Sequence, residues 1–324
     1  MAIDITRFNK CCILVIGDLM IDEYVWGTVD RISPEAPVQI VSVDREDYTL
    51  GGAGNVVNNL AALGAYISVA GVIGTGADGS RLLKKFKLLN ADTGGVIREP
   101  KRPTTRKTRI IAANQHVLRI DRETNRDISN STFEALNRFV SKKIPETDVV
   151  LISDYGKGLI TTPFIRYILD TAKKYSKITI TDPKGLDFEK YAGVSLLTPN
   201  QKEAGLASGI EIKDETALIK AGNKLLKTTG IENLLITCGK KGMVLFEQGR
   251  SPYTIKSEAR QVFDVSGAGD TVLSVFGLAI ASGFSFKKAA AIANTAAGIV
   301  VGKLGTATVS QKELSSVLKK FPDK

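Results

Sequence analysis

The chain has 324 residues, of which 43% are hydrophobic and 24% are charged, so it can bury a large core and fits one large domain or two small ones. No apolar run reaches the roughly 18 residues that a membrane span requires, and the first ten residues lack the apolar stretch of a secretory signal. These features exclude a membrane-spanning or secreted class and predict a cytoplasmic globular protein.

Cysteine and histidine are scarce. Cys11 and Cys12 are neighbours in a strand-like segment and point to opposite faces, so Cys238 is the only partner left for either. The single histidine, His116, and the absence of a CxxC pair argue against a zinc site. The sequence thus predicts no disulfide framework, and any metal is expected to be a hard cation bound by oxygen.

The net charge of +10 raises the question of a nucleic-acid partner. Most basic residues are scattered along helical segments, which is typical of solvated faces. The exception is KRPTTRKTR, residues 101–109, with five basic residues in nine; it fits either a soluble edge strand or a site for an anionic ligand. Aromatic residues are not interleaved with this run, so a small phosphorylated ligand is favoured over nucleic acid.

The first half of the chain opens with a short buried strand and then exposed ones. The strand is expected at 11–17. Four later segments alternate apolar and polar residues with period two and are expected to be strands exposed on one face, namely 24–33, 36–44, 105–112 and 116–121. Between them a glycine-led helix at 51–65, a strand at 66–74 and a helix at 78–90 are expected.

From residue 148 the alternation is regular. Strands are expected at 148–153, 177–182, 194–198 and 233–239, and helices at 162–175, from 200, and at 214–229. This order predicts a mostly parallel sheet with helices on both faces. No linker or repeat divides the chain, so residues 1–324 are expected to form a single domain. Insertions at about 23–45 and 100–121 are expected to form a lid over the strand ends.

The motif GTGADG, residues 74–79, matches G-x-G-x-x-G between an expected strand and helix, which is the context of a dinucleotide-binding fingerprint. The preceding strand is not the first of the sheet, however, and the only nearby acidic candidate for a ribose contact, Asp92, opens a new element. A tight strand-to-helix turn is therefore preferred, with an NAD-dependent oxidoreductase as the alternative of a different class. No GxxxxGK[ST] P-loop occurs.

The stretch DVSGAGDT, residues 264–271, places very small residues before an apolar helix. Backbone N–H groups of residues 267–269 can turn toward one point there, and the helix N-terminus adds partial positive charge. The pattern predicts an anion site. If the anion is a transferring phosphoryl group, Asp270 lies beside it and can take the proton of an attacking hydroxyl; alternatively, Asp270 only caps the helix.

The segments GGAGNVVNNLAALG and DVSGAGDT, with the spacing between them, resemble the GG-x-x-N and D-x-x-G-A-G-D signatures of the ribokinase-like (PfkB) family of sugar kinases. GDLMIDEYVWG, RISPEAPV, SDYGKG, TDPKG, TPN and AAGIVVGKLGTATVS are similar to the branch that phosphorylates a heptose 7-phosphate. The resemblance covers residues 11–312. It implies an α/β fold, a ribokinase-like three-layer α/β/α sandwich with a mostly parallel sheet plus a small β-strand lid.

The resemblance also assigns roles at matching positions. Asp270 is implied to be the catalytic base, and the amides of Gly267, Ala268 and Gly269 the anion hole. For ATP and Mg²⁺ it implies Asn200, Glu203, Thr237, Gly239, Gly242, Lys184 and Asn294, with Mg²⁺ held indirectly through Glu203. It leaves open a monovalent cation such as K⁺. From the residues alone, Asn200 and Glu203 also fit an N-cap and its capping-box partner.

On the sugar side, the resemblance points to Asp18, Asp22, Gly52 and Asn55, with an exposed lid charge as the alternative for Asp22. A phosphate already on the substrate is expected to be held by basic residues of the lid and of SDYGKG, namely Lys157, Lys107, Arg109 and Arg119. Period two puts Lys107 and Arg109 on one strand face, with Arg119 in the partner strand.

The implied reaction is ATP-dependent phosphorylation of the C1 hydroxyl of D-glycero-β-D-manno-heptose 7-phosphate to the 1,7-bisphosphate, in ADP-heptose and lipopolysaccharide core synthesis. Another PfkB sugar or sugar-phosphate kinase is the alternative. With one histidine the chain has no H-x-G-H nucleotide-binding motif, so it is expected to carry the kinase step only. A homodimer through the lid strands is also implied, without nucleic acid or membrane partners.

Overall fold

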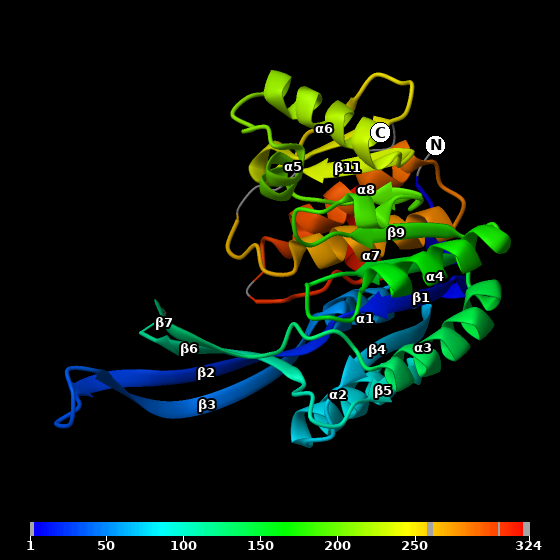
Figure 1. The fold of residues 1–324 in the computed structure, drawn as a ribbon. Helices are drawn as coiled ribbons and strands as arrows, with labels where there is room; N and C mark the ends of the chain where they lie inside the picture. The colour runs from blue at the N-terminus through cyan, green and yellow to red at the C-terminus, as the bar shows by residue number, and fades with distance from the viewer. Residues whose placement is uncertain (1–2, 114, 258–261, 304, 320–324) are drawn as a thin grey trace.

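The computed structural model describes residues 3–113, 115–257, 262–303 and 305–319. Its centre is a nine-stranded sheet in the order β13-β12-β11-β10-β9-β8-β1-β4-β5 (Figure 1). The parallel part consists of β5 (Asp92–Arg98), β4 (Tyr66–Ile73), β1 (Cys12–Gly17), β8 (Val149–Ser153), β9 (Ile178–Asp182), β10 (Leu196–Leu197) and β11 (Asn233–Thr237). Two antiparallel strands, β12 (Met243–Glu247) and β13 (Tyr253–Ile255), complete one edge.

Helices cover both faces of this sheet, as the alternating pattern predicts. One layer contains α1 (Ala53–Ala62), α2 (Ala77–Leu88), α7 (Ala268–Ala281), α8 (Phe286–Val300) and α9 (Gln311–Leu318). The other contains α3 (Asn130–Lys143), α4 (Thr162–Lys174), α5 (Gln201–Ser208) and α6 (Glu215–Thr229). Neighbouring residues of β1 alternate between the two cores, Ile13 in the first and Leu14 in the second. The predicted three-layer α/β/α arrangement is therefore confirmed.

A second, four-stranded sheet in the order β3-β2-β6-β7 projects from one side of the molecule (Figure 1). It consists of the hairpin β2 (Leu19–Ile32) and β3 (Gln39–Gly52) and the hairpin β6 (Thr105–Ala112) and β7 (Gln115–Arg122). These are the four segments whose period-two pattern predicts exposed strands. Because β2 begins two residues after β1 ends, Asp18 lies where the two sheets meet.

Some elements were not predicted, and the reasons are local. β5 carries two glycines in DTGGVIR, which weaken a strand pattern. β12 and β13 follow β11 as hairpin strands with no helix between them, so the strand–helix alternation gives no sign of them. Among the described residues, no helix is long and apolar enough to cross a membrane. The three cysteines are free, as expected.

Two of the three glycines of GTGADG are explained by packing, whereas a Cβ atom on Gly76 would meet nothing within 4 Å. A Cβ atom on Gly74 would lie 2.3 Å from the carbonyl oxygen of Arg102, and one on Gly79 would lie 2.3 Å from the carbonyl oxygen of Gly74. The Gly74 N–H also donates to Thr104 Oγ1 at 2.9 Å. The motif is thus a tight turn from β4 into α2 that packs against residues 102–104, which is the preferred interpretation.

Candidate active site

Asp270 lies in the first turn of α7 with only 4% of its surface exposed. The N-cap of this helix is Gly267, which has a left-handed φ of 76° that favours glycine. A Cβ atom there would lie 2.5 Å from Asn55 Nδ2, so only glycine lets the Asn55 side chain come this close to the backbone at the start of α7. The alternative in which Asp270 serves as the helix cap is wrong, because Gly267 occupies the N-cap and no side-chain cap is formed.

Two donors hold the Asp270 carboxylate. Asn55 Nδ2 donates to Oδ2 at 2.8 Å and the Tyr155 hydroxyl donates to Oδ1 at 2.9 Å. Burial raises the pKa of Asp270 to about 6, and these two hydrogen bonds oppose that rise. The carboxyl group is therefore an anion at neutral pH with a pKa suited to general-base chemistry.

Of the three amides predicted for the anion hole, one has an internal partner. The Ala268 N–H donates to the Val265 carbonyl oxygen at 3.2 Å, a contact at the long end of hydrogen-bond distances. An anion would have to compete with this contact, whereas the helix N-terminus itself still favours negative charge.

Asp18 is buried at the end of β1 and binds the turn that follows β8. Its Oδ2 accepts the backbone N–H groups of Tyr155 at 2.8 Å and Lys157 at 3.1 Å. Burial and the neighbouring Asp154 raise the pKa of Asp18 to about 6. Gly52, with a φ of 54°, passes so close that a Cβ atom would lie 2.6 Å from the Asp18 carbonyl oxygen. Of the predicted sugar-side residues, Asn55 contacts Asp270 directly, Asp18 is connected to Asp270 through Tyr155, and Gly52 packs against Asp18.

Asp22 is 5% exposed and pairs with Arg109 Nη1 at 2.5 Å, so the alternative of an exposed lid charge is wrong. The Arg109 guanidinium also lies 5.3 Å from the centre of the Tyr24 ring. Strand register places Lys107 opposite Asp121 and Arg109 opposite Arg119. Lys107 and Arg109 therefore share one face of the small sheet, as period two predicts.

Every basic side chain predicted for a substrate phosphate already has a carboxylate partner. Lys157 Nζ lies 2.7 Å from Glu123, Lys107 Nζ lies 3.2 Å from both Glu123 and Asp121, and Arg119 Nε lies 3.0 Å from Asp121. An incoming phosphate has to exchange with these partners rather than meet free cations. Asp121 lies two residues from Arg119 in β7, but Lys107 and Lys157 belong to other segments than their partners Asp121 and Glu123, so the sequence predicts these two lysines and does not reveal what they pair with.

Two further cations of the basic run are paired as well. Arg102 Nε lies 3.2 Å from Glu99, and Arg106 lies 3.4 Å from Glu23 and 3.5 Å from Asp78. The segment 101–109 is therefore largely neutralised within the protein.

A cavity of about 250 Å³ lies between the β11–β12 loop, the start of α7 and α8. Its lining includes four residues predicted for the nucleotide and two predicted for the anion hole, namely Thr237, Gly239, Gly242, Asn294, Ala268 and Gly269. Gly242 has a φ of 96°, and a Cβ atom there would lie 2.0 Å from the Ile255 carbonyl oxygen. Asn294 Nδ2 donates to the Lys256 carbonyl oxygen at 2.9 Å. The cavity therefore leads to the first turn of α7.

Asn200, Glu203 and Lys184 form a separate cluster at the start of α5. Asn200 and Glu203 make a full capping box, with the Glu203 N–H 2.9 Å from Asn200 Oδ1 and the Asn200 N–H 3.1 Å from Glu203 Oε2. Lys184 Nζ lies 2.9 Å from Glu203 Oε1. The structural role expected from the residues alone is present, and it leaves the Glu203 carboxylate on the surface beside a cation.

Sequence reasoning missed two residues of this site. Tyr155 contacts Asp270, and Asp182 lies near Asp270 and Glu203, whose charges together with burial raise the pKa of Asp182 well above its usual range. Both lie at the carboxyl ends of strands: Tyr155 is the second residue after β8, and Asp182 is the last residue of β9. That position is the available sequence signal, because ligands of open α/β sheets bind there.

The residues of this site could hold Mg²⁺ only together with the phosphates of a nucleotide. Among residues 3–319, apart from the few left undescribed, no group of three or more His, Cys, Asp or Glu side chains could hold a metal. In phosphoryl-transfer sites, however, Mg²⁺ is usually bound by one or two carboxylates plus phosphates and water. The single Glu203 carboxylate, whose side chain is 16% exposed, fits a nucleotide-bound Mg²⁺ and does not fit a metal cage.

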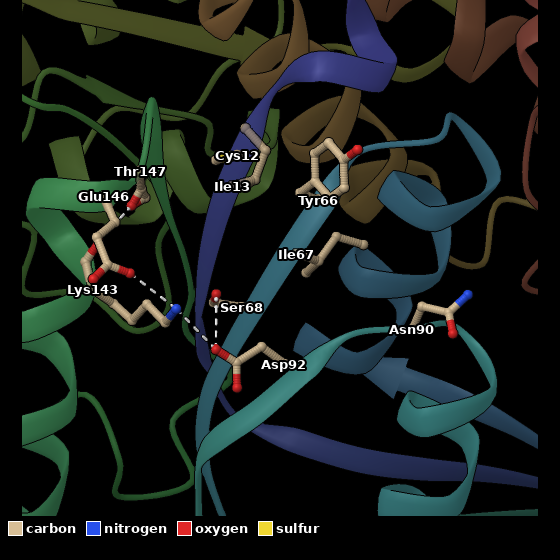
Figure 2. A pocket seen from close by; sticks show the side chains of 10 residues that line it. All are labelled: Cys12, Ile13, Tyr66, Ile67, Ser68, Asn90, Asp92, Lys143, Glu146 and Thr147. Atoms are coloured by element: carbon tan, nitrogen blue, oxygen red, sulfur yellow. Dashed lines mark hydrogen bonds and ion pairs between the residues drawn. The ribbon is translucent and has the colours of Figure 1, made fainter.

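A second hollow of about 290 Å³ lies at the opposite ends of the strands, where β1 and β4 begin (Figure 2). Lys143 Nζ lies 3.0 Å from Asp92 and 3.1 Å from Glu146 there, and both contacts raise the pKa of Lys143. Among the described residues that line the hollow, the one cation is thus paired with two carboxylates. The hollow lies at the far end of β1 from Asp18 and is separate from the candidate active site.

Comparison with known proteins identifies similar sequences. A model of the pfkB family carbohydrate kinases matches residues 12–313. The chain is 55% identical over 319 residues to bifunctional protein HldE of Desulfatibacillum aliphaticivorans, covering 98% of this chain and 65% of that protein. It is 50% identical over 301 residues to HldE of Geobacter metallireducens, covering 93% and 61%. The chain thus spans less than two thirds of the length of these relatives.

Solved structures share the fold. Arabidopsis thaliana ribokinase complexed with ribose and ATP aligns with a TM-score of 0.76 at 20% identity, over 96% of this chain and 99% of that one. Escherichia coli phosphofructokinase-2 in complex with potassium aligns with a TM-score of 0.78 at 16% identity, over 97% and 100%. At these identities the likeness establishes the ribokinase-like fold.

Replacing Asp270 by Asn is expected to change how stability depends on pH. Burial raises the pKa of Asp270 from 3.8 to about 6. The contribution of this group to the free energy of unfolding is therefore largest below pH 3.8 and is lost as the pH rises through about 6. The total loss is about 3 kcal/mol at most. Asp270→Asn should therefore lose less stability between pH 4 and pH 7 than the wild type, as measured by urea unfolding. Equal losses would contradict the raised pKa.

Proposed function

Because the chain belongs to the pfkB family of carbohydrate kinases and is thus a phosphotransferase with an alcohol acceptor, we propose that its acceptor is the C1 hydroxyl of D-glycero-β-D-manno-heptose 7-phosphate. The product is then the 1,7-bisphosphate. The observation that carries the proposal is the Asp270 carboxylate, which is held by Asn55 and Tyr155 where the nucleotide-side cavity meets the sugar-side residues. The segments that resemble heptose 7-phosphate kinases support the substrate.

The chemistry follows from this placement. Asp270 accepts the proton of the C1 hydroxyl while that oxygen forms a bond to the γ-phosphorus and the bond from this phosphorus to the ADP oxygen breaks. The N-terminus of α7, with Gly267, Ala268 and Gly269, stabilises the negative charge on the transferring group. ATP supplies the phosphoryl group, and Mg²⁺, when bound, neutralises phosphate charge. Burial of the site limits the hydrolysis of ATP by water.

The sugar phosphate is proposed to bind on the charged face of the small sheet. Lys107 and Lys157 share the carboxylate of Glu123, so these two ammonium groups already lie around one negatively charged group. A phosphate dianion can take the place of that carboxylate. Movement of the small sheet over the bound sugar would then act as lid closure.

The relatives are named bifunctional and are longer than this chain, so we assign only the kinase step to these residues. We place the reaction in the cytoplasm, where ATP is supplied. A different sugar or sugar-phosphate acceptor of the same family is the second candidate, because residues of the small sheet would set that choice.

Turnover of a panel of sugars tests the acceptor. ADP release should be fastest with the heptose 7-phosphate and should be lost in Asp270→Asn, by roughly 10²-fold or more, with ATP affinity unchanged in a fluorescence titration. Faster turnover of a hexose or hexose phosphate would replace the proposed substrate, and an active Asp270→Asn variant would overturn the base assignment.

Glu203→Gln separates the two roles of Glu203. The amide oxygen of Gln can still accept the Asn200 N–H, so the capping box and the stability of α5 should be kept. The loss of charge should raise the Mg²⁺ concentration for half-maximal activity by roughly tenfold. A magnesium titration that superimposes on that of the wild type would leave Glu203 with the capping role alone.

We also propose a homodimer formed through the small sheet. β7 is one of the two edge strands of this sheet, and its Leu118 and Ile120 are 54% and 50% exposed. An exposed apolar edge of this kind can pair with another chain. Leu118→Lys should shift the protein to monomers in sedimentation velocity, while Leu88→Lys on the exposed side of α2 should not. A wild-type monomer, or a dimer that survives Leu118→Lys, would contradict this assembly.

A further inference from the structure

The turn after β8, residues 154–157, reaches two carboxylates of the candidate active site. The Tyr155 hydroxyl donates to Asp270 Oδ1 at 2.9 Å, and the backbone N–H of the same residue donates to Asp18 Oδ2 at 2.8 Å. Asp270 belongs to α7 and Asp18 to the junction of the two sheets. A single residue therefore links the proposed base to the proposed sugar side.

This turn is itself held firmly. Asp154 is buried, and its Oδ1 accepts the Gly156 N–H at 2.7 Å. Its Oδ2 accepts the Tyr191 hydroxyl at 2.7 Å and lies 2.7 Å from Lys190 Nζ. Gly156 has a left-handed φ of 66°, which suits a tight turn. The Tyr191 hydroxyl also accepts the backbone N–H of Lys184 at 2.9 Å, so the network that holds the turn borders the residues predicted for the nucleotide.

We propose that Tyr155 is a positioning residue for phosphoryl transfer. Its hydroxyl fixes the orientation of the Asp270 carboxylate, and its backbone N–H fixes the position of Asp18 relative to that base. This inference rests on the proposed function, because it assigns Tyr155 an effect on the base and not on a ligand. With Asn55 on Oδ2 and Tyr155 on Oδ1, each oxygen keeps a lone pair to accept the acceptor hydroxyl.

The groups around Asp270 determine in which direction the loss of the Tyr155 hydroxyl would change the pKa of Asp270. Burial and Asp22 raise the pKa of Asp270, and the hydrogen bonds from Asn55 and Tyr155 lower it. Asp182, on the β9 side, is a further acidic neighbour, since Asp270 raises its pKa. Burial and Asp270 also raise the pKa of Tyr155 well above its usual range, so its hydroxyl keeps its proton and remains a donor at neutral pH.

Tyr155→Phe tests the proposal because it removes the hydroxyl and keeps the ring. Without this donor the Asp270 anion is less stable, so the acidic limb of the kcat/KM profile should move to higher pH by about one unit. At pH 6 the rate should fall roughly fivefold, because the deprotonated fraction of a base whose pKa rises from about 6 to about 7 falls by that factor. KM for ATP should stay unchanged. Tyr175→Phe, at an exposed tyrosine at the end of α4, is the matched control and should leave the profile unmoved.

Site-specific replacement of Tyr155 by 3-fluorotyrosine gives a second test if the phenylalanine variant fails to fold. A fluorinated phenol is a stronger donor, so the acidic limb should move to lower pH. An unmoved limb in either folded variant, with a uniform loss of rate at every pH, would overturn the inference and leave a structural role. In that case an inactive Asp270→Asn would still uphold the proposed function, whereas an active Asp270→Asn would reject the function itself.

Discussion

The candidate site depends on keeping one carboxylate charged where almost no water reaches it. Burial alone disfavours the Asp270 anion, and two donors from distant parts of the chain oppose that cost. Asn55 comes from α1 and Tyr155 from the turn after β8, while α7 supplies the carboxylate. Because the result is a base with a pKa of about 6, it is deprotonated at neutral pH yet basic enough to take a proton from a hydroxyl.

The topology of the sheet brings these groups together. Parallel strands end at one edge, so the residues after β1, β8 and β9 meet the first turn of α7 there. The small sheet begins at this same edge of the central sheet, because only one residue separates β2 from the end of β1. The residues proposed for the nucleotide and those proposed for the sugar are therefore supported by different parts of the chain, and the proposed base Asp270 belongs to the helix that lines the nucleotide-side cavity.

Much of this could be predicted from the sequence, because periodicity and small residues are local signals. The alternation of strands and helices gives the layers, and DVSGAGDT gives the start of α7 and Asp270. Long-range pairing could not be predicted in the same way. No sequence pattern near Asp22 indicates that it is buried in an ion pair with Arg109. Glu123 lies in a linker, and no motif indicates that it pairs with Lys107. Tyr155 was overlooked for the same reason, since its contact with Asp270 depends on the fold.

The most direct test of the central claim is a crystal structure with a non-hydrolysable ATP analogue, Mg²⁺ and the heptose 7-phosphate. The account predicts the γ-phosphorus at the N-terminus of α7, and the C1 hydroxyl about 2.6–3.2 Å from an oxygen of Asp270. A γ-phosphate bound away from residues 267–269, or a C1 hydroxyl that faces another side chain, would contradict it.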